Sequence, residues 1–207
     1  MKKWNEVPVR ASIEKAAAAL NANGFETVIA KDAAEAAGKA LALVPEGAEA
    51  FTMASVTLDQ IGVSKEINDS GRFDAVRGKL YAMDKEKQGR EMRKYGAAPD
   101  VALGSVHAVT EKGSLVIASL TGSQLPAYAY GSGTVIFVVG AQKIVADLDE
   151  AFKRIETYTL PLESARARKA YGLPDSFNSF PSKMLVLNRE IQPGRIKVVL
   201  VEESIGF

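Results

Sequence analysis

Two short apolar runs constrain this chain more than any other feature of its sequence. They read LVIA (residues 115–118) and TVIFVV (residues 134–139), and glycines lie close to both. Short runs rich in β-branched residues are typical of strands that are buried on both faces. The apolar residues after Gly140 are spaced as on one helical face: Ile144, Leu148, Phe152 and Ile155. Strand, glycine turn and helix in this order favour a parallel α/β sheet.

The rest of the chain fits the same architecture. Ser12 and Asp32 are placed to cap helices, and a proline closes the second helix at residues 44–45. Further expected helices cover residues 12–23, 84–94 and 164–171, and further expected strands cover residues 25–30, 50–54, 184–187 and 196–202. Residues 160–162 are expected to break the helix that precedes them. The sequence predicts one domain, residues 1–207: an open, mainly parallel sheet with helices on both faces.

Composition excludes several classes of function. The 207 residues carry a net charge of +1, so the chain lacks the excess of basic residues that is typical of nucleic-acid-binding proteins. No apolar stretch is long enough for a secretory signal or a membrane span, so we expect a cytoplasmic protein. There is no cysteine, which excludes disulfides and cysteine-ligated iron–sulfur clusters in this chain. A single histidine argues against a zinc site, and we expect no metal site.

Small polar residues gather where strands are expected to end. Ser55 and Thr57 follow the second strand, Lys143 follows the run at 134–139, and Thr121, Gly122 and Ser123 follow the run at 115–118. Parallel strands align their carboxyl ends, and ligands of such sheets bind outside those ends. We therefore expect these residues to converge on a pocket for a small anion, with Lys143 as its positive charge.

Each of these residues has a plainer interpretation as well. Thr57 could cap the helix that follows it, which is compatible with anion binding at the same helix end. Lys143 is expected at a helix N-terminus, where the dipole disfavours a cation, so it needs an anionic partner or solvent. His107 has no companion serine or aspartate and is expected to be an ordinary strand residue.

The central stretch also resembles a known family. The segments GSVHAVTEKGSLVI and TGSQLPAYAYGSGTVIFVVGAQKIVADLDEAFKRI are similar to the lactate-utilization (LUD) domain family, as are SVTLDQIG at residues 55–62 and LPLESARARKAYG at residues 160–172. The resemblance implies the open α/β fold shared by sugar-phosphate isomerases and CoA transferases. It also implies a part in the oxidation of lactate to pyruvate, with iron–sulfur clusters held only by partner proteins.

The related fold suggests one catalytic candidate, Glu111. In CoA transferases a glutamate attacks the acyl thioester, which requires a carboxylate that reaches a carbonyl in a dry pocket. The motif around Glu111 departs from the transferase pattern. The sequence Glu111-Lys112-Gly113 also suits a hairpin tip, with Gly113 in the left-handed position.

Three functions remain open at this point. The preferred one is a cytoplasmic subunit or accessory protein that oxidises lactate or a similar 2-hydroxy acid together with iron–sulfur partners. The alternative is an autonomous isomerase-like or CoA-transferase-like enzyme acting on a small phosphorylated or CoA-linked substrate. A module that senses a ligand without catalysis is the third. The sequence leaves the oligomeric state open.

Overall fold

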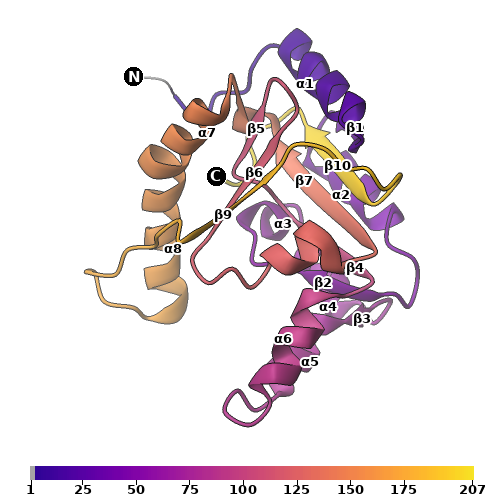
Figure 1. The fold of residues 1–207 in the computed structure, drawn as a ribbon, viewed down its shortest axis with the longest axis vertical. Coiled ribbons are helices and arrows are strands. Elements are labelled where there is room, and N and C mark those ends of the chain that lie inside the picture. Colours follow the sequence, from indigo (N-terminus) through magenta and orange to yellow (C-terminus); the bar gives the residue numbers. More distant parts are fainter. Residues whose placement is uncertain (1–2) are drawn as a thin grey trace.

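The computed structural model describes residues 3–207 and contains a six-stranded parallel sheet (Figure 1). Its strands, in spatial order, are β1 (Glu26–Ala30), β10 (Ile196–Val201), β7 (Thr134–Gly140), β4 (Val101–Gly104), β2 (Glu49–Thr52) and β3 (Asp74–Ala75). Every neighbouring pair is parallel. The main sheet therefore confirms the open α/β architecture expected from the sequence.

Helices cover one face of the main sheet. The α-helices within residues 3–207 are α1 (Arg10–Ala22), α2 (Ala33–Ala42), α3 (Val56–Gln60), α4 (Val63–Asp69), α5 (Val76–Ala82), α6 (Gly89–Ala97), α7 (Leu148–Arg154) and α8 (Leu160–Tyr171). Ala36 of α2, Leu58 of α3 and Ile67 of α4 pack with Ile136 and Val138 of β7 in one buried cluster. No helix within residues 3–207 combines the length and apolar character needed to cross a bilayer.

A second, smaller sheet covers the other face. It comprises β8 (Ile144–Val145), β5 (Ala108–Thr110), β6 (Leu115–Ser119) and β9 (Lys183–Leu187), with β6 antiparallel to both of its neighbours. Ile117 of β6 and Leu20 of α1 share a buried cluster with Phe137 of β7. The outer face of the small sheet packs against α7, where Val116 meets Ala151. The layers are thus helix, sheet, sheet and helix.

This second sheet corrects part of the sequence interpretation. Residues 115–118 do form a buried strand, but it lies in the small sheet, where it is antiparallel to both neighbours. Ile144 belongs to β8, because it pairs in parallel with Val109, and the helix begins only at Leu148. Asp147 sets that start, since its side chain accepts a hydrogen bond from the Glu150 N–H. Phe152 consequently points to solvent.

Three helix ends also differ from expectation. Ser12 caps nothing, because α1 begins at Arg10 without a side-chain cap, whereas Asp32 caps α2 as predicted. The helix expected at residues 84–94 lies at Gly89–Ala97. The expected break at residues 160–162 does not occur. A wide π-helical segment, η3 (Ile155–Thr159), joins α7 to α8, and Pro161 lies in the first turn of α8.

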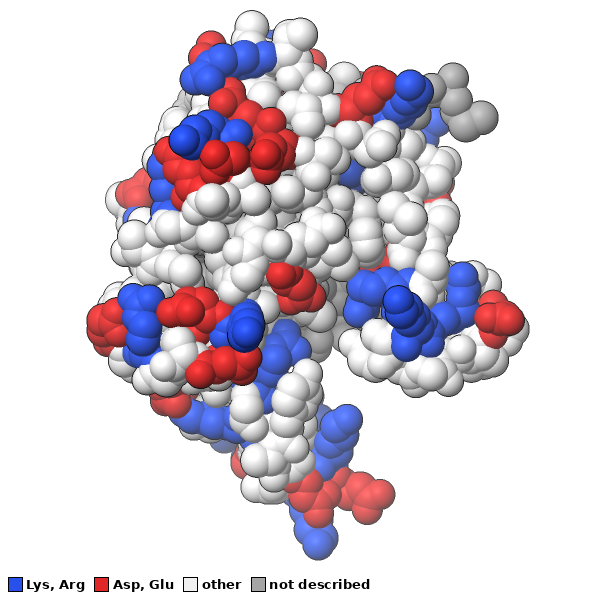
Figure 2. All heavy atoms as spheres, turned by 180° about the vertical axis from the view of Figure 1, so that it is seen from behind, with Lys and Arg blue, Asp and Glu red and all other residues white. Residues whose placement is uncertain are grey.

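The surface carries no single dominant charge. On the face seen in Figure 2, basic and acidic side chains are interspersed, including on the projecting arm of α5 and α6. This mixed pattern agrees with the net charge of +1.

The capping role of Asp147 can be tested by substitution. We expect Asp147→Ala to lower the free energy of unfolding by about 1 kcal/mol, because the first turn of α7 loses its side-chain acceptor. Asp149→Ala is the matched control, since it removes a carboxylate from the same turn but leaves the cap. Urea unfolding followed by circular dichroism measures both. Equal losses in the two variants would contradict the assignment.

Candidate functional site

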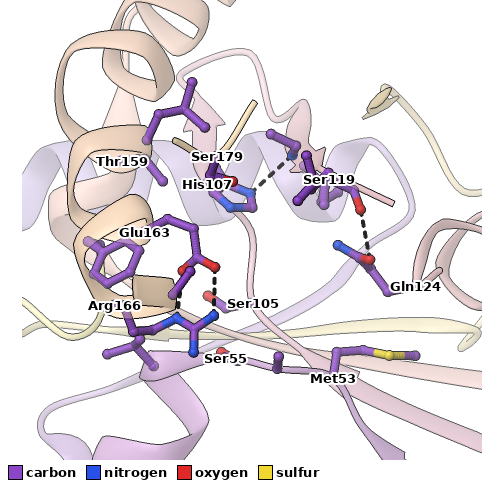
Figure 3. Close-up of a pocket in the computed structure, with 18 of the residues that line it drawn as sticks. Met53, Ser55, Ser105, His107, Ser119, Gln124, Thr159, Glu163, Arg166 and Ser179 are labelled. Carbon is purple, nitrogen blue, oxygen red and sulfur yellow. Dashed lines mark hydrogen bonds and ion pairs between the residues drawn. The ribbon is translucent and has the colours of Figure 1, made fainter. Parts of the chain in front are cut away.

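A pocket of about 540 Å³ opens at the carboxyl ends of β2, β4 and β7 (Figure 3). Residues after β2, β4 and β7 line one part of it, and residues of β6, of the loop after β6 and of α8 also line it. Its polar lining residues are Ser55, Thr57, Ser105, His107, Ser119, Thr121, Ser123, Gln124, Lys143, Thr159, Glu163, Arg166 and Ser179. The pocket thus occupies the sheet edge where ligands of parallel sheets usually bind.

Lys143 supplies a buried positive charge to this pocket. It ends the short 3₁₀ turn η2 (Ala141–Lys143) after β7, and only 1% of its surface is exposed. Its Nζ donates to Thr57 Oγ1 at 3.0 Å and to Ser105 Oγ at 3.1 Å. No carboxylate within residues 3–207 forms an ion pair with it. Burial, together with the charge of Arg154, lowers the pKa of Lys143 to about 7.

Tight packing from the C-terminal segment fixes Thr57 and Lys143. Gln142 donates from Nε2 to the carbonyl of Ile205 at 2.8 Å, which holds that segment over the turn. Gly206 has a φ of 63°, and a Cβ there would fall 2.1 Å from Thr57 Oγ1. The hydroxyl of Ser55 accepts from the Leu58 N–H and caps α3, so Thr57 is free to face the lysine.

Arg154 forms a second buried cation behind the pocket. It is fully buried, and one guanidinium nitrogen donates to the His107 carbonyl at 2.6 Å and to Thr159 Oγ1 at 3.1 Å. Burial lowers the pKa of Arg154 to about 10, which still leaves it charged at neutral pH. Two desolvated cations without a buried anion make this region favourable for an anionic ligand.

His107 presents a neutral imidazole to the pocket. Its Nδ1 accepts the Ala118 N–H at 3.1 Å, so the ring proton resides on Nε2 (Figure 3). Burial, with the charges of Lys143 and Arg154, lowers the pKa of His107 to about 3. His107 lies just before β5 and lines the pocket, so it is not the ordinary strand residue expected from the sequence. Its Nε2–H is a hydrogen-bond donor rather than a charge.

The loop after β6 reaches the same pocket from the small sheet. Thr121 and Ser123 line it, and their hydroxyls hydrogen-bond each other at 3.1 Å. Gly122 does not line the pocket. It shapes the turn instead, with a φ of 84° and no room for a Cβ beside Lys183. The predicted convergence of Ser55, Thr57 and Lys143 follows from parallel strands, whereas this loop arrives from the second sheet.

Glu111 lies away from the pocket. It occupies the turn between β5 and β6 and pairs with Lys15 of α1 at 2.6 Å. Gly113 closes this turn with a φ of 80°, donating to the Thr110 carbonyl. The hairpin interpretation is therefore the one the structure adopts, and nothing in the geometry supports Glu111 as a nucleophile.

Sequence reasoning missed several residues that line the pocket. Glu163 is the one acidic side chain among the lining residues, and it forms a two-point ion pair with Arg166 through contacts of 2.7 and 2.6 Å. An acid and a base three residues apart on one helix could have indicated this pair. Ser105 follows β4 as Ser55 follows β2, so the strand-end argument could have found it. The described residues offer no group of three or more potential metal ligands.

The protonation state of His107 can be measured directly. We expect its imidazole C2–H resonance to remain in the range of a neutral ring between pH 5 and pH 8, because the ring keeps its neutral form down to about pH 3. Untagged protein is required, since the chain has only this histidine. The same protein unfolded in urea is the control and should titrate near pH 6.5. A folded-state midpoint near 6.5 would refute the assignment of a neutral ring.

Comparisons with known proteins place the chain in a family. A crystal structure of a DUF162 family protein from Deinococcus radiodurans is similar, with a TM-score of 0.57 and 14% identity over 94% of this chain and 99% of that one. At this identity the likeness concerns the fold alone. A search of curated proteins finds no match. The family model of the LUD domain matches residues 13–201. The chain therefore belongs to the LUD domain family, which links it in general terms to lactate utilization.

Proposed function

We propose that this protein binds lactate or a similar 2-hydroxy acid in the pocket and takes part in its oxidation to the 2-oxo acid in the cytoplasm. The observation that carries the proposal is Lys143, a buried ammonium group held by two hydroxyls and no carboxylate. A substrate carboxylate would supply the missing negative charge. Membership of the LUD domain family supports the choice of a 2-hydroxy acid.

The neighbouring groups suit the rest of such a substrate. The hydroxyls of Thr57 and Ser105 accept hydrogen bonds from the ammonium group, and His107 adds a neutral Nε2–H donor to the same pocket. Such groups can orient a 2-hydroxyl without competing for the carboxylate.

Oxidation of a 2-hydroxy acid releases two electrons and two protons. This chain supplies no cysteine thiolate for an iron–sulfur cluster. We therefore assign the electron-accepting clusters to partner proteins.

A second candidate function rests on the size of the pocket. Lactate fills roughly the space of four waters, on the order of 120 Å³ at about 30 Å³ each. The pocket holds about 540 Å³ and includes the hydroxyl loop of Thr121 and Ser123. This excess space favours a larger ligand, and a phosphorylated or CoA-linked substrate turned over without a partner is the alternative.

Calorimetric titration of lactate tests the binding site. We expect binding at pH 6.5 and an affinity more than about tenfold weaker at pH 8.5, because Lys143 loses its proton as the pH rises through about 7. Lys143→Met should abolish binding at both values. Lys153→Met is the control, since Lys153 is exposed on α7 and outside the pocket.

Two results would count against the site. Equal affinity at both pH values would exclude a role for the Lys143 charge. Binding that survives Lys143→Met would place the acid elsewhere. Turnover of a sugar phosphate or acyl-CoA by the isolated chain would favour the second candidate.

Isolation from the native host tests the partner assignment. We expect the tagged chain to retain a cysteine-rich protein with acid-labile sulfide, because electrons need an acceptor outside this chain. The Lys143→Met variant should retain the same partner, which separates assembly from ligand binding. Repeated recovery of the chain alone, with normal growth of a deletion strain on lactate, would contradict the proposal.

A further inference from the structure

The pocket has an inner end and an outer end of different chemistry. Lys143 and Thr57 at the inner end are each 1% exposed. Tyr171 and Phe180, which line the same pocket, are 64% and 61% exposed and therefore lie at its mouth. Leu173 and Phe177 complete an apolar group from the end of α8 and the loop after it. A polar inner end thus faces an aromatic mouth.

Hydrogen bonds hold this aromatic mouth in place. Arg168 donates from its guanidinium to the Phe177 carbonyl at 2.7 Å, and the Ser179 N–H donates to Ser164 Oγ at 2.9 Å. Both bonds tie the loop to α8. The Arg166 guanidinium lies 5.7 Å from the Tyr171 ring centre. The apolar surface is therefore built before a ligand arrives, which lowers the entropy cost of binding.

The charges lining the pocket fit a single negative group. Its cationic lining side chains are Lys143 and Arg166, and its one acidic side chain is Glu163. Because Arg166 is committed to Glu163 in a two-point ion pair, Lys143 is the cation left for a ligand. A monocarboxylate satisfies that charge, whereas the several phosphate charges of a CoA tail would find no further cation among these residues.

We propose that the substrate is a 2-hydroxy acid with a large apolar or aromatic side chain, bound with its carboxylate at Lys143 and its side chain against Tyr171, Phe177 and Phe180. This inference rests on the proposed function and specifies its substrate class. The side chain would occupy the part of the pocket that lactate leaves unfilled, and it would remove apolar surface from water on both molecules.

Calorimetric titration at pH 6.5 with lactate, phenyllactate and an acyl-CoA tests this inference. We expect phenyllactate to bind at least about tenfold more tightly than lactate. The double variant Tyr171→Ala/Phe180→Ala should lose most of that preference, because its affinity for phenyllactate falls toward that for lactate. Both residues are exposed, so their removal leaves the core intact. The matched control is Tyr130→Ala/Phe152→Ala, an exposed pair outside the pocket.

The outcomes separate this inference from the function on which it rests. Equal affinities for the two acids, or a preference that survives the double variant, would overturn the inference and leave the proposed function standing. Failure of both acids to bind would overturn both. Tighter binding of the acyl-CoA than of phenyllactate would overturn the inference in favour of a CoA-linked substrate.

Discussion

Burial of β7 on both faces is the constraint on which the other layers depend. Alternate residues of β7 belong to two separate buried clusters, with Phe137 on one side of the sheet and Ile136 on the other. Helices α2, α3 and α4 cover one face, and the other requires α1 and the small sheet. Because the small sheet has its own outer face to bury, α7 must pack on it in turn. The four layers therefore follow from one strand whose two faces must both be buried from water.

The pocket lies where these layers separate, at the carboxyl edge of the main sheet. There the chain buries the cations Lys143 and Arg154 and gives them hydroxyl and carbonyl acceptors instead of carboxylates. Charges buried in this way destabilise a fold, and they are tolerated mainly where function requires them. Desolvation, together with these two charges, lowers the pKa of His107 and keeps its ring neutral. Of these two cations Lys143 lines the pocket and Arg154 does not, so the site offers one unpaired charge beside neutral hydrogen-bonding groups.

Local signals in the sequence were reliable where neighbouring residues alone decide the structure. Asp32 caps α2 because its side chain reaches the Glu35 N–H, an interaction within one turn. The same reasoning failed for Ile144, whose spacing fits a helix but whose backbone pairs with Val109. Glu111 shows the same limit, since its partner Lys15 lies 96 residues away in the sequence. Only the packing of distant segments determines which of two locally possible structures forms.

The sequence by itself determined the parallel α/β class, the family, and the meeting of Ser55, Thr57 and Lys143, because parallel strands must place their carboxyl ends together. The tertiary structure alone decided that residues 115–118 join a second sheet. It also brought His107 and Glu163 to the pocket and left Lys143 without a carboxylate. These features depend on contacts between segments far apart in the chain and on burial from water. Neither the long-range contacts nor the burial can be inferred from a local sequence pattern, because a group is desolvated only when the layers pack around it.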